Sequence, residues 1–344
     1  MSGRKLTRQQ RERVQAIQAR RIDRVTVRDD GDDSRLGPEQ EGTVITRFGA
    51  HIDVEAADRS VILRCRLRAN LENPVTGDRV VWRRSPSLVE GEADGGVVVA
   101  VLPRRSELRR PDNYGKLKAV AANIDHAIIV FAPLPTPSSA LLDRYLAAAE
   151  TAGLAPVLLM NKSDLDSVPG HAEAERLAKL YARIGYRVLR CSSRTAHGLD
   201  ELRGFLRGRT CVFVGQSGVG KSSLVNTLLP EAALATQEVS ATSGLGQHTT
   251  TSARLFHLPA SGGDLIDSPG VREFQLWHVG EDALEDAWID FRPFRGQCRF
   301  RDCRHLKEPG CALRAAVERG ELAGERLDNF LRIRESLKDA PELR

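Results

Sequence analysis

The chain has 344 residues, of which 41% are hydrophobic and 28% are charged, and its formal net charge is +5. This composition is ordinary for a soluble globular protein, and the length is sufficient for two or three domains. A membrane-spanning chain is excluded, because no apolar run approaches the ~20 residues that a bilayer requires. The first residues also lack the apolar segment of a secretory signal, so we expect a cytoplasmic protein.

The positive charge is concentrated in an N-terminal arm. Residues 1–24 contain eight Lys or Arg against two acidic residues, which leaves −1 for the rest of the chain. Such an arm favours a polyanionic partner such as nucleic acid over a merely solubilising tail. The acidic, Gly- and Pro-containing segment 29–41 is typical of a linker. We therefore assign residues 1–40 to a basic arm and linker.

Short β-type runs separated by turns follow the linker. They lie at residues 42–48, 51–54, 61–67, 78–82 and 96–101. Five short strands at this spacing favour a small closed barrel such as an OB-fold, which we place at residues 41–106. In the third run, Arg64, Arg66 and Arg68 alternate with apolar residues and therefore share one face. We interpret this face as an RNA-binding surface, with an ordinary solvated face as the alternative.

From Ile124 onward the pattern changes to alternating strands and helices. Strands are predicted at residues 126–131, 156–160, 186–189 and 210–214. Apolar residues at helical spacing predict one helix that begins after Ser138 and ends near Gly153, and a second helix, containing Leu177 to Ile184, that ends at Gly185. This alternation is typical of a doubly wound parallel sheet, whose binding sites lie at the strand ends. We assign residues 107–277 to this α/β domain and residues 278–344 to a helical C-terminal domain.

A phosphate-binding loop follows the strand at residues 210–214. It has the full GxxxxGKS pattern between an apolar strand and an apolar-faced helix. Backbone N–H groups of such a loop surround phosphate oxygens, Lys221 reaches the β- and γ-phosphates, and the Ser222 hydroxyl binds Mg²⁺. The residues assigned to this loop are Gly215, Gln216, Ser217, Gly218, Val219, Gly220, Lys221, Ser222 and Ser223.

A guanine-selecting NKxD motif stands at the end of another strand. Its residues are Asn161, Lys162, Ser163 and Asp164. The Asp164 carboxylate can accept from guanine N1–H and the exocyclic amine, and adenine lacks that pair of donors. Ser192 and Ser193 stand where a GTPase has its second base-binding loop, although a plain polar loop is the alternative.

The order of these motifs is rotated relative to an ordinary GTPase. NKxD precedes the phosphate loop here, whereas the phosphate loop comes first in an ordinary GTPase. A rotated order with every motif present indicates a circular permutation.

Two further segments fit the switch regions of a GTPase. Residues 267–270 fit DxxG, with Asp267 directed toward Mg²⁺ and the Gly270 N–H toward the γ-phosphate, although an ordinary Pro-Gly turn is the alternative. In the run of three threonines before it, we assign the Mg²⁺-binding and catalytic hydroxyl to Thr250, with Thr249 as the alternative.

The attacking water needs a partner other than the usual glutamine. Val271 occupies the position after Gly270, where an apolar side chain cannot orient water. His248, beside the threonines, is the nearest candidate, and an exposed loop histidine is the equally weighted alternative. Slow intrinsic hydrolysis, accelerated by a partner, is the expected consequence.

A metal site is predicted in the C-terminal domain. Its four ligands are Cys298, Cys303, His305 and Cys311. Three thiolates and an imidazole complete a tetrahedral set for one structural Zn²⁺, and independent reduced cysteines are the alternative. The arginines around the site favour a second RNA contact. They are Arg292, Arg295, Arg299, Arg301 and Arg304.

Together these motifs resemble the RsgA (YjeQ) family of ribosome small subunit-dependent GTPases. The resemblance covers roughly residues 40–340 and rests on the order NKSD, GQSGVGKSS, HTTT, DSPG and the cysteine cluster, after a barrel. It implies an OB-fold, a permuted GTPase domain and a zinc domain that act in late maturation of the small ribosomal subunit. It also implies GTP hydrolysis stimulated by that subunit and coupled to release, contact with 16S-type rRNA, and a role for His248 in hydrolysis.

We therefore expect a monomeric GTP hydrolase that binds GTP, GDP and the small subunit and does not bind membranes. One alternative is an RNA-binding adaptor that holds GTP as a structural or sensing ligand and barely hydrolyses it. Another is a GTPase that acts on a different RNA or on a translation factor.

Overall fold

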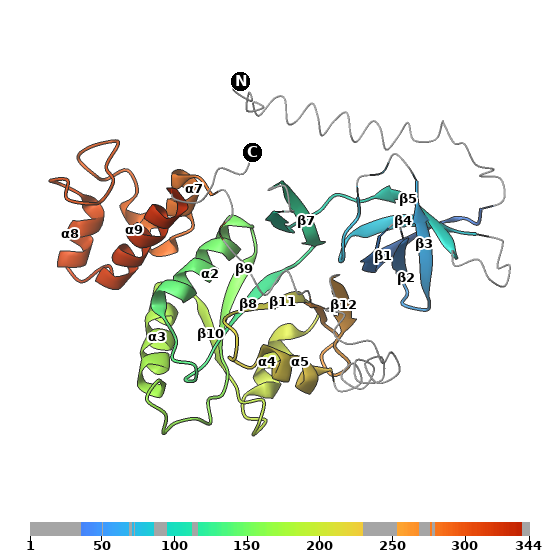
Figure 1. The fold of residues 1–344 in the computed structure, drawn as a ribbon, viewed down its shortest axis with the longest axis horizontal. Helices are drawn as coiled ribbons and strands as arrows, with labels where there is room; N and C mark the ends of the chain where they lie inside the picture. The colour runs from blue at the N-terminus through green and yellow to red at the C-terminus, as the bar shows by residue number, and fades with distance from the viewer. Residues whose placement is uncertain are drawn as a thin grey trace. The chain divides into compact units, whose positions relative to one another are not determined.

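Five short strands form a closed barrel at the N-terminal end of the described chain (Figure 1). The computed structural model describes residues 36–49, 51–68, 71, 73–85, 95–111, 116–229, 253–267, 276 and 279–338, so the basic arm lies outside the described residues. The barrel strands are β1 (Glu39–Phe48), β2 (His51–Ala56), β3 (Ile62–Leu67), β4 (Arg79–Arg84) and β5 (Gly96–Val101). They pair in the order β1-β2-β3-β5-β4, and β4 pairs back with β1. The prediction of a closed OB-type barrel is confirmed.

The barrel interior is filled by the inward side chains of its strands. Ile52, Val54, Val80 and Trp82 are all buried. Gly42 is required beside them, because a Cβ there would lie 2.5 Å from the Glu55 carbonyl oxygen and 2.9 Å from the Trp82 indole nitrogen. Because side chains alternate between the two faces of each strand, one face of every strand contributes to a packed core. Gly42 allows its backbone to lie close to Glu55 and Trp82 within that core.

Strand β3 presents its arginines to solvent, as its alternation predicts. Cys65 is buried, whereas Arg64 and Arg66 are exposed on the opposite face. Arg64 is held by Asp53 of the neighbouring strand β2, with 3.0 Å between Nε and Oδ1. The shared exposed face is confirmed for Arg64 and Arg66, whereas Arg68 is half-buried and follows the end of the strand.

The second half of the fold is a mostly parallel sheet with a helix after most of its strands. In chain order its elements are β8 (His126–Phe131), α2 (Ser139–Thr151), β9 (Ala155–Met160), α3 (His171–Ile184), β10 (Arg187–Arg190), α4 (Leu199–Leu206), β11 (Thr210–Val214), α5 (Lys221–Leu228), β12 (Arg254–His257) and β13 (Asp264–Asp267). The strand order is β10-β9-β8-β11-β13-β12, in which β12 alone runs antiparallel to its neighbour β13. The predicted doubly wound sheet is confirmed.

Side chains of β8 alternate between two hydrophobic cores. Ile129 and Phe131 belong to the core that contains the apolar faces of α2 and α3, while Ile128 and Val130 belong to the core that contains α4 and α5. Figure 1 shows these two pairs of helices on different faces of the sheet. Because both faces of the sheet are covered, its central strands β8, β9 and β11 are mostly apolar and buried, and the carboxyl ends of the strands carry the polar loops.

A hairpin that the sequence pattern did not indicate precedes this sheet. Its strands are β6 (Glu107–Pro111) and β7 (Leu117–Ala122). The alanine-rich β7 lacks the β-branched alternation of a strand. Beside the hairpin, the fully buried Asp78 accepts two hydrogen bonds of 2.7 Å from Arg104. This ion pair joins the start of the hairpin segment to residues 75–78.

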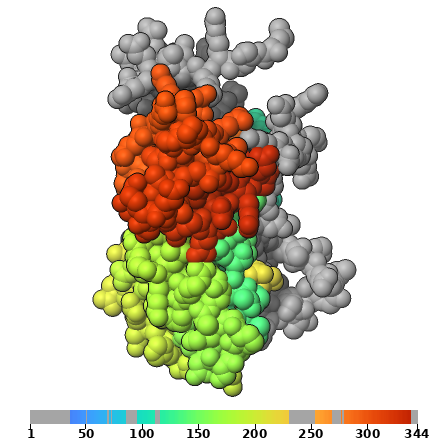
Figure 2. Space-filling model, turned by 90° about the vertical axis from the view of Figure 1, so that its left-hand side faces the viewer, coloured from blue at the N-terminus to red at the C-terminus, as the bar shows by residue number. Residues whose placement is uncertain are grey.

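The described C-terminal region contains three short helices and one longer helix. They are α7 (Glu281–Asp286), the 3₁₀-helix η2 (Ile289–Phe294), α8 (Ala312–Glu318) and α9 (Gly324–Lys338). Trp288, Phe291 and Phe330 form its aromatic centre, and the Phe330 ring centroid lies 5.2 Å from each of the other two. Helix α9 packs on α2, so this region (orange and red) rests on the green α2–α3 part of the chain in Figure 2.

The chain divides into two compact units whose division does not follow strand ends. The first holds most of the barrel and ends at Pro103, whereas Val44–Phe48 and Val75–Asp78 belong to the second unit, with Arg104 onward. Among the described residues, every helix is too short or too polar to cross a membrane.

Candidate nucleotide site and metal centre

The predicted phosphate loop forms a tight turn between β11 and α5. Gly215 and Gly220 have φ values of +139° and +96°, in a region that favours glycine. A Cβ on Gly215 would lie 2.2 Å from the Val130 carbonyl oxygen, and one on Gly220 would lie 2.3 Å from Asn161 Nδ2. The loop is therefore built around glycines, and it ends at Lys221, where helix α5 begins.

Lys221 is folded back onto this loop. Its ammonium donates to the carbonyl oxygens of Gly215 and Gln216, at 2.5 and 2.7 Å. The cation is thereby held at the mouth of the loop, where a phosphate group would add negative charge.

Asn161 joins the NKxD motif to both neighbouring loops. It is fully buried at the end of β9, and its Nδ2 donates to the Val219 carbonyl oxygen at 3.0 Å. Its Oδ1 accepts from the Ser193 N–H at 3.3 Å and from the Cys191 thiol at 3.6 Å. One amide therefore holds the phosphate loop and the second base loop in a fixed relation.

Lys162 makes a second link to the phosphate loop. It has a φ of +58°, and its ammonium donates to the carbonyl oxygens of Gly218 and Leu134, at 2.7 and 2.8 Å. The half-buried Asp164 follows two residues later. The buried Ser192 organises the predicted second base loop, since its hydroxyl accepts from the backbone N–H groups of Arg194 and Thr195 at 3.2 and 3.1 Å. The structure thus brings three loops that are distant in sequence to one edge of the sheet.

Asp267 lies at the same edge, at the carboxyl end of β13. Strands β11 and β13 are parallel neighbours, and Ile266 pairs with Val212. Since the phosphate loop follows β11, the half-buried Asp267 ends its strand next to the strand that carries that loop. The other predicted switch residues, His248, Thr249, Thr250, Gly270 and Val271, lie outside the described residues.

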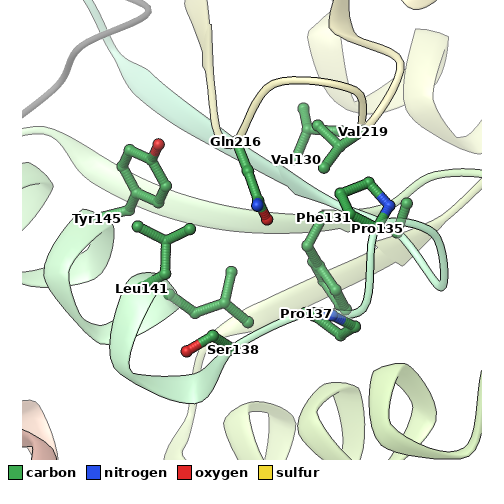
Figure 3. A pocket seen from close by; sticks show the side chains of 11 residues that line it. Val130, Phe131, Pro135, Pro137, Ser138, Leu141, Tyr145, Gln216 and Val219 are labelled. Carbon is green, nitrogen blue, oxygen red and sulfur yellow. The ribbon is translucent and has the colours of Figure 1, made fainter. Parts of the chain in front are cut away.

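A small apolar pocket adjoins the phosphate loop (Figure 3). Gln216 extends into it, with Tyr145 and Leu141 of α2 on one side and Val219 and Pro135 on the other. Its lining is mostly apolar, unlike the three polar loops at the edge of the sheet. The pocket shows that the phosphate loop packs against the start of α2.

The four predicted metal ligands converge, although they come from an irregular segment between η2 and α8. Their ligand atoms all lie within 4.8 Å of one another, and His305 and Cys311 are buried. His305 Nδ1 lies 3.3 Å from Cys311 Sγ and 3.7 Å from Cys298 Sγ. These separations fit four ligands around one tetrahedral ion, and the set leaves no position for a substrate.

Side chains and backbone groups support this ligand loop. The Glu308 carboxylate accepts from the backbone N–H groups of Arg304, Leu306 and Lys307, at 2.8–3.0 Å. A hydrogen bond from the backbone N–H of Glu308 itself, together with these three, lowers the pKa of its carboxyl group. His305 has a φ of +61°, a costly conformation for a non-glycine residue, which the surrounding hydrogen bonds stabilise.

The arginines predicted to surround the metal site differ in their availability. Arg292 and Arg295 form ion pairs with Glu150 and Asp286 respectively. Arg299 stacks on Phe300, at 5.6 Å from guanidinium carbon to ring centroid. Arg301 and Arg304 are exposed, as are Phe300 and Leu306 at 42% and 46%. The surface is therefore partly neutralised and partly apolar, which the sequence pattern did not show.

A buried ion network was also missed by sequence reasoning. Arg326 of α9 is 1% exposed and donates to Asp290 with hydrogen bonds of 2.7 and 3.0 Å. Its third nitrogen donates to Asp143 of α2, which also accepts from Tyr181 and Asn329. Burial raises the pKa of Asp143, and Arg326 opposes that rise. Burial by itself lowers the pKa of Arg326, but the two carboxylates raise it overall, so Arg326 is charged.

Comparison with known proteins gives consistent matches. A protein-family model described as RsgA GTPase matches residues 101–277. The chain is 51% identical to a protein of Azotobacter vinelandii and 50% identical to one of Dickeya dadantii, both named "Small ribosomal subunit biogenesis GTPase RsgA". These matches cover 98% of this chain in each case, and 99% and 96% of the two relatives.

Two solved structures are similar over most of the chain. YjeQ from Thermotoga maritima has a TM-score of 0.70 and 29% identity, covering 88% of this chain and 99% of that one. YloQ, described as a circularly permuted GTPase, has a TM-score of 0.69 and 30% identity, covering 91% of this chain and 98% of that one. The circular permutation inferred from motif order is confirmed by these likenesses.

Proposed function

Since the chain belongs to the RsgA GTPase family, we propose that it hydrolyses GTP to GDP and phosphate during late maturation of the small ribosomal subunit. Binding to the subunit, through 16S-type rRNA, would stimulate hydrolysis, and hydrolysis would promote release. The names of its relatives support the assignment to this subunit. The protein would act as a monomer in the cytoplasm.

The observation that carries the GTP site is the junction made by Asn161 and Lys162. Together they hydrogen-bond to Val219, Gly218 and Ser193, in the loops where phosphate and base must meet. In this arrangement Asp164 would accept from the guanine N1–H and amine, with the Ser193 N–H near the guanine oxygen. The assignment accounts for a base loop and a phosphate loop held at a fixed distance, as one nucleotide requires.

The phosphates would lie against the loop at residues 215–220 and the start of α5. There Lys221 would exchange its backbone carbonyl partners for β- and γ-phosphate oxygens. Ser222, Thr250 and Asp267 would hold Mg²⁺, which supplies charge neutralisation on the phosphates. The Gly270 N–H would contact the γ-phosphate, and His248 would orient the attacking water.

The cysteine cluster would hold one structural Zn²⁺. Three thiolates with one imidazole suit this ion, and their convergence in a segment of short helices supports a role in folding. We propose four parts for the chain: an arm (1–40), an RNA-binding barrel (41–106), the GTPase domain (107–277) and a zinc domain (278–344). The exposed Arg301 and Arg304, with the Arg66 face of β3, would contact rRNA phosphates.

The primary test is GTP turnover by the purified protein alone, with small subunits, and with large subunits as the control. Stimulation by small subunits alone is expected. Equal rates in all three reactions would reject the proposal and favour an adaptor that holds GTP as a bound ligand. His248→Ala should lower the stimulated rate about 10²- to 10⁴-fold while leaving GTP affinity nearly unchanged.

Base selection has its own test. Asp164→Asn should weaken GTP binding and improve binding of xanthosine triphosphate, because the amide can donate to the 2-oxo group that replaces the guanine amine. Asp166→Asn, at an exposed carboxylate two residues away, is the matched control and should change neither affinity. Unaltered GTP affinity in Asp164→Asn would contradict the assignment of the base site.

A further inference from the structure

We propose that Glu285 positions the metal ligand His305 by accepting a hydrogen bond from its second ring nitrogen. The inference rests on the proposed zinc site and adds a residue outside the ligand segment. His305 Nδ1 faces the sulfurs of Cys298 and Cys311, while Nε2 lies 3.4 Å from the Glu285 carboxylate. The ring is thus placed between the ligand cluster on one side and a carboxylate on the other.

The chemistry of the ring requires such an acceptor. A neutral imidazole carries one N–H, and the nitrogen that binds a metal ion must be unprotonated. With Nδ1 directed at the cluster, the proton must therefore be on Nε2. The side chain of His305 is only 6% exposed, so water has little access to that N–H. Glu285 supplies the acceptor, which selects the tautomer and makes Nδ1 a better donor to the metal.

The other nearby carboxylates have different partners. Glu308 is closer to His305 in sequence, but its oxygens accept three backbone N–H groups of the ligand loop. Asp286, next to Glu285 on α7, forms an ion pair with Arg295. Among these three acids of the described C-terminal region, Glu285 is the one whose oxygen contacts the imidazole.

The two supports act on different parts of His305. Glu308 and the Arg314 guanidinium, which donates to the His305 carbonyl oxygen at 3.1 Å, hold the strained backbone. Glu285, from a separate helix, holds the ring. Since α7 also contacts α2 and α9, the hydrogen bond ties the ligand loop to the body of the domain.

The test is Zn²⁺ affinity, measured by competition with a chromophoric chelator on the full-length protein. Glu285→Ala should weaken binding about 10- to 100-fold, as the loss of an outer-shell partner does elsewhere. Glu285→Gln, whose amide oxygen can still accept, should lose less. Asp286→Asn is the matched control on the same helix and should retain wild-type affinity.

A double-mutant cycle separates this role from a general effect on folding. His305→Cys keeps a metal ligand but removes the second nitrogen, so adding Glu285→Ala to it should have no further effect on Zn²⁺ affinity. An equal loss in both backgrounds, or no loss in the wild-type background, would overturn the inference while leaving the zinc site intact. A wild-type protein that does not bind Zn²⁺ would instead overturn the zinc site and this inference together.

Discussion

The nucleotide site and the metal centre are assembled in opposite ways. At the nucleotide site, parallel strands end together, and Asn161 and Lys162 join the three loops by direct hydrogen bonds. At the metal centre, the ligands lie on an irregular segment between the short helices η2 and α8. The four ligand atoms of the metal centre lie within 4.8 Å of one another, although little secondary structure holds them. One site is organised by the sheet, whereas the other would need the proposed ion to hold its ligands together.

Removal of the metal should have the largest effect and should affect the two regions differently. In small zinc domains, metal binding supplies on the order of 10 kcal/mol of folding free energy, so chelation should unfold the C-terminal helices. Guanine nucleotide affinity should change by no more than about twofold, because sites without shared partners act almost independently. Circular dichroism and nucleotide titration of the chelated protein measure both effects.

The reactivity of individual cysteines shows whether removal of the metal unfolds the C-terminal region without unfolding the α/β domain. After chelation, the three cluster cysteines should react with an aromatic disulfide reagent. Cys191 and Cys211 should stay slow until global unfolding, since both thiols are fully buried, whereas Cys298 and Cys303 of the cluster are half-buried. Simultaneous reaction of both groups would show that the two regions unfold as one.

Arg326 limits the independence of the two regions, because it joins the C-terminal region to α2. Arg326→Met leaves Asp143 buried without its cation and should cost about 3–5 kcal/mol of unfolding free energy in urea titrations. The matched control is Arg176→Met, which removes the more exposed pair between α3 and Glu325 of α9 and should cost less than about 1 kcal/mol. Similar losses in the two variants would argue against the buried network as the main connection.

Asn161→Ala tests whether the loops of the nucleotide site are organised before the nucleotide binds. The Val219 carbonyl, the Ser193 N–H and the Cys191 thiol would all lose a partner. The expected loss of stability in nucleotide-free protein is about 1–3 kcal/mol. If stability falls only when nucleotide is present, the loops are instead organised by binding.

The smallest expected effect is a pH dependence at the edge of the sheet. A hydrogen bond from Arg190 lowers the pKa of Glu175 in the folded protein. Its contribution is therefore present above the ordinary glutamate pKa of about 4.3 and is lost as pH falls through the lower folded pKa. Glu175→Gln should cost less than about 1 kcal/mol at pH 7, and melting curves should show the difference vanishing in acid.

Much of this molecule was predictable from short stretches of sequence. Alternation identified the barrel strands and the exposed face of Arg64 and Arg66, and the glycine pattern identified the phosphate loop with its positive φ angles. The hairpin at residues 107–122 was not predicted, because β7 is rich in alanine and lacks a β-type pattern. The domain boundaries, the switch residues and their catalytic roles stay predictions.

The sequence by itself determined the features that depend on a few consecutive residues, such as the NKxD strand end, the phosphate loop and the spacing of four metal ligands. Local backbone geometry is set by neighbours along the chain, so such motifs can be recognised without a fold. Only the tertiary structure shows which charged side chains form ion pairs or hydrogen bonds with each other. Asp143 meets Arg326 from 183 positions away, and Glu285 reaches the far side of His305 from a separate helix. A charged residue has the same appearance in sequence whether it faces water or a buried partner, because its role depends on burial and on the geometry of distant segments.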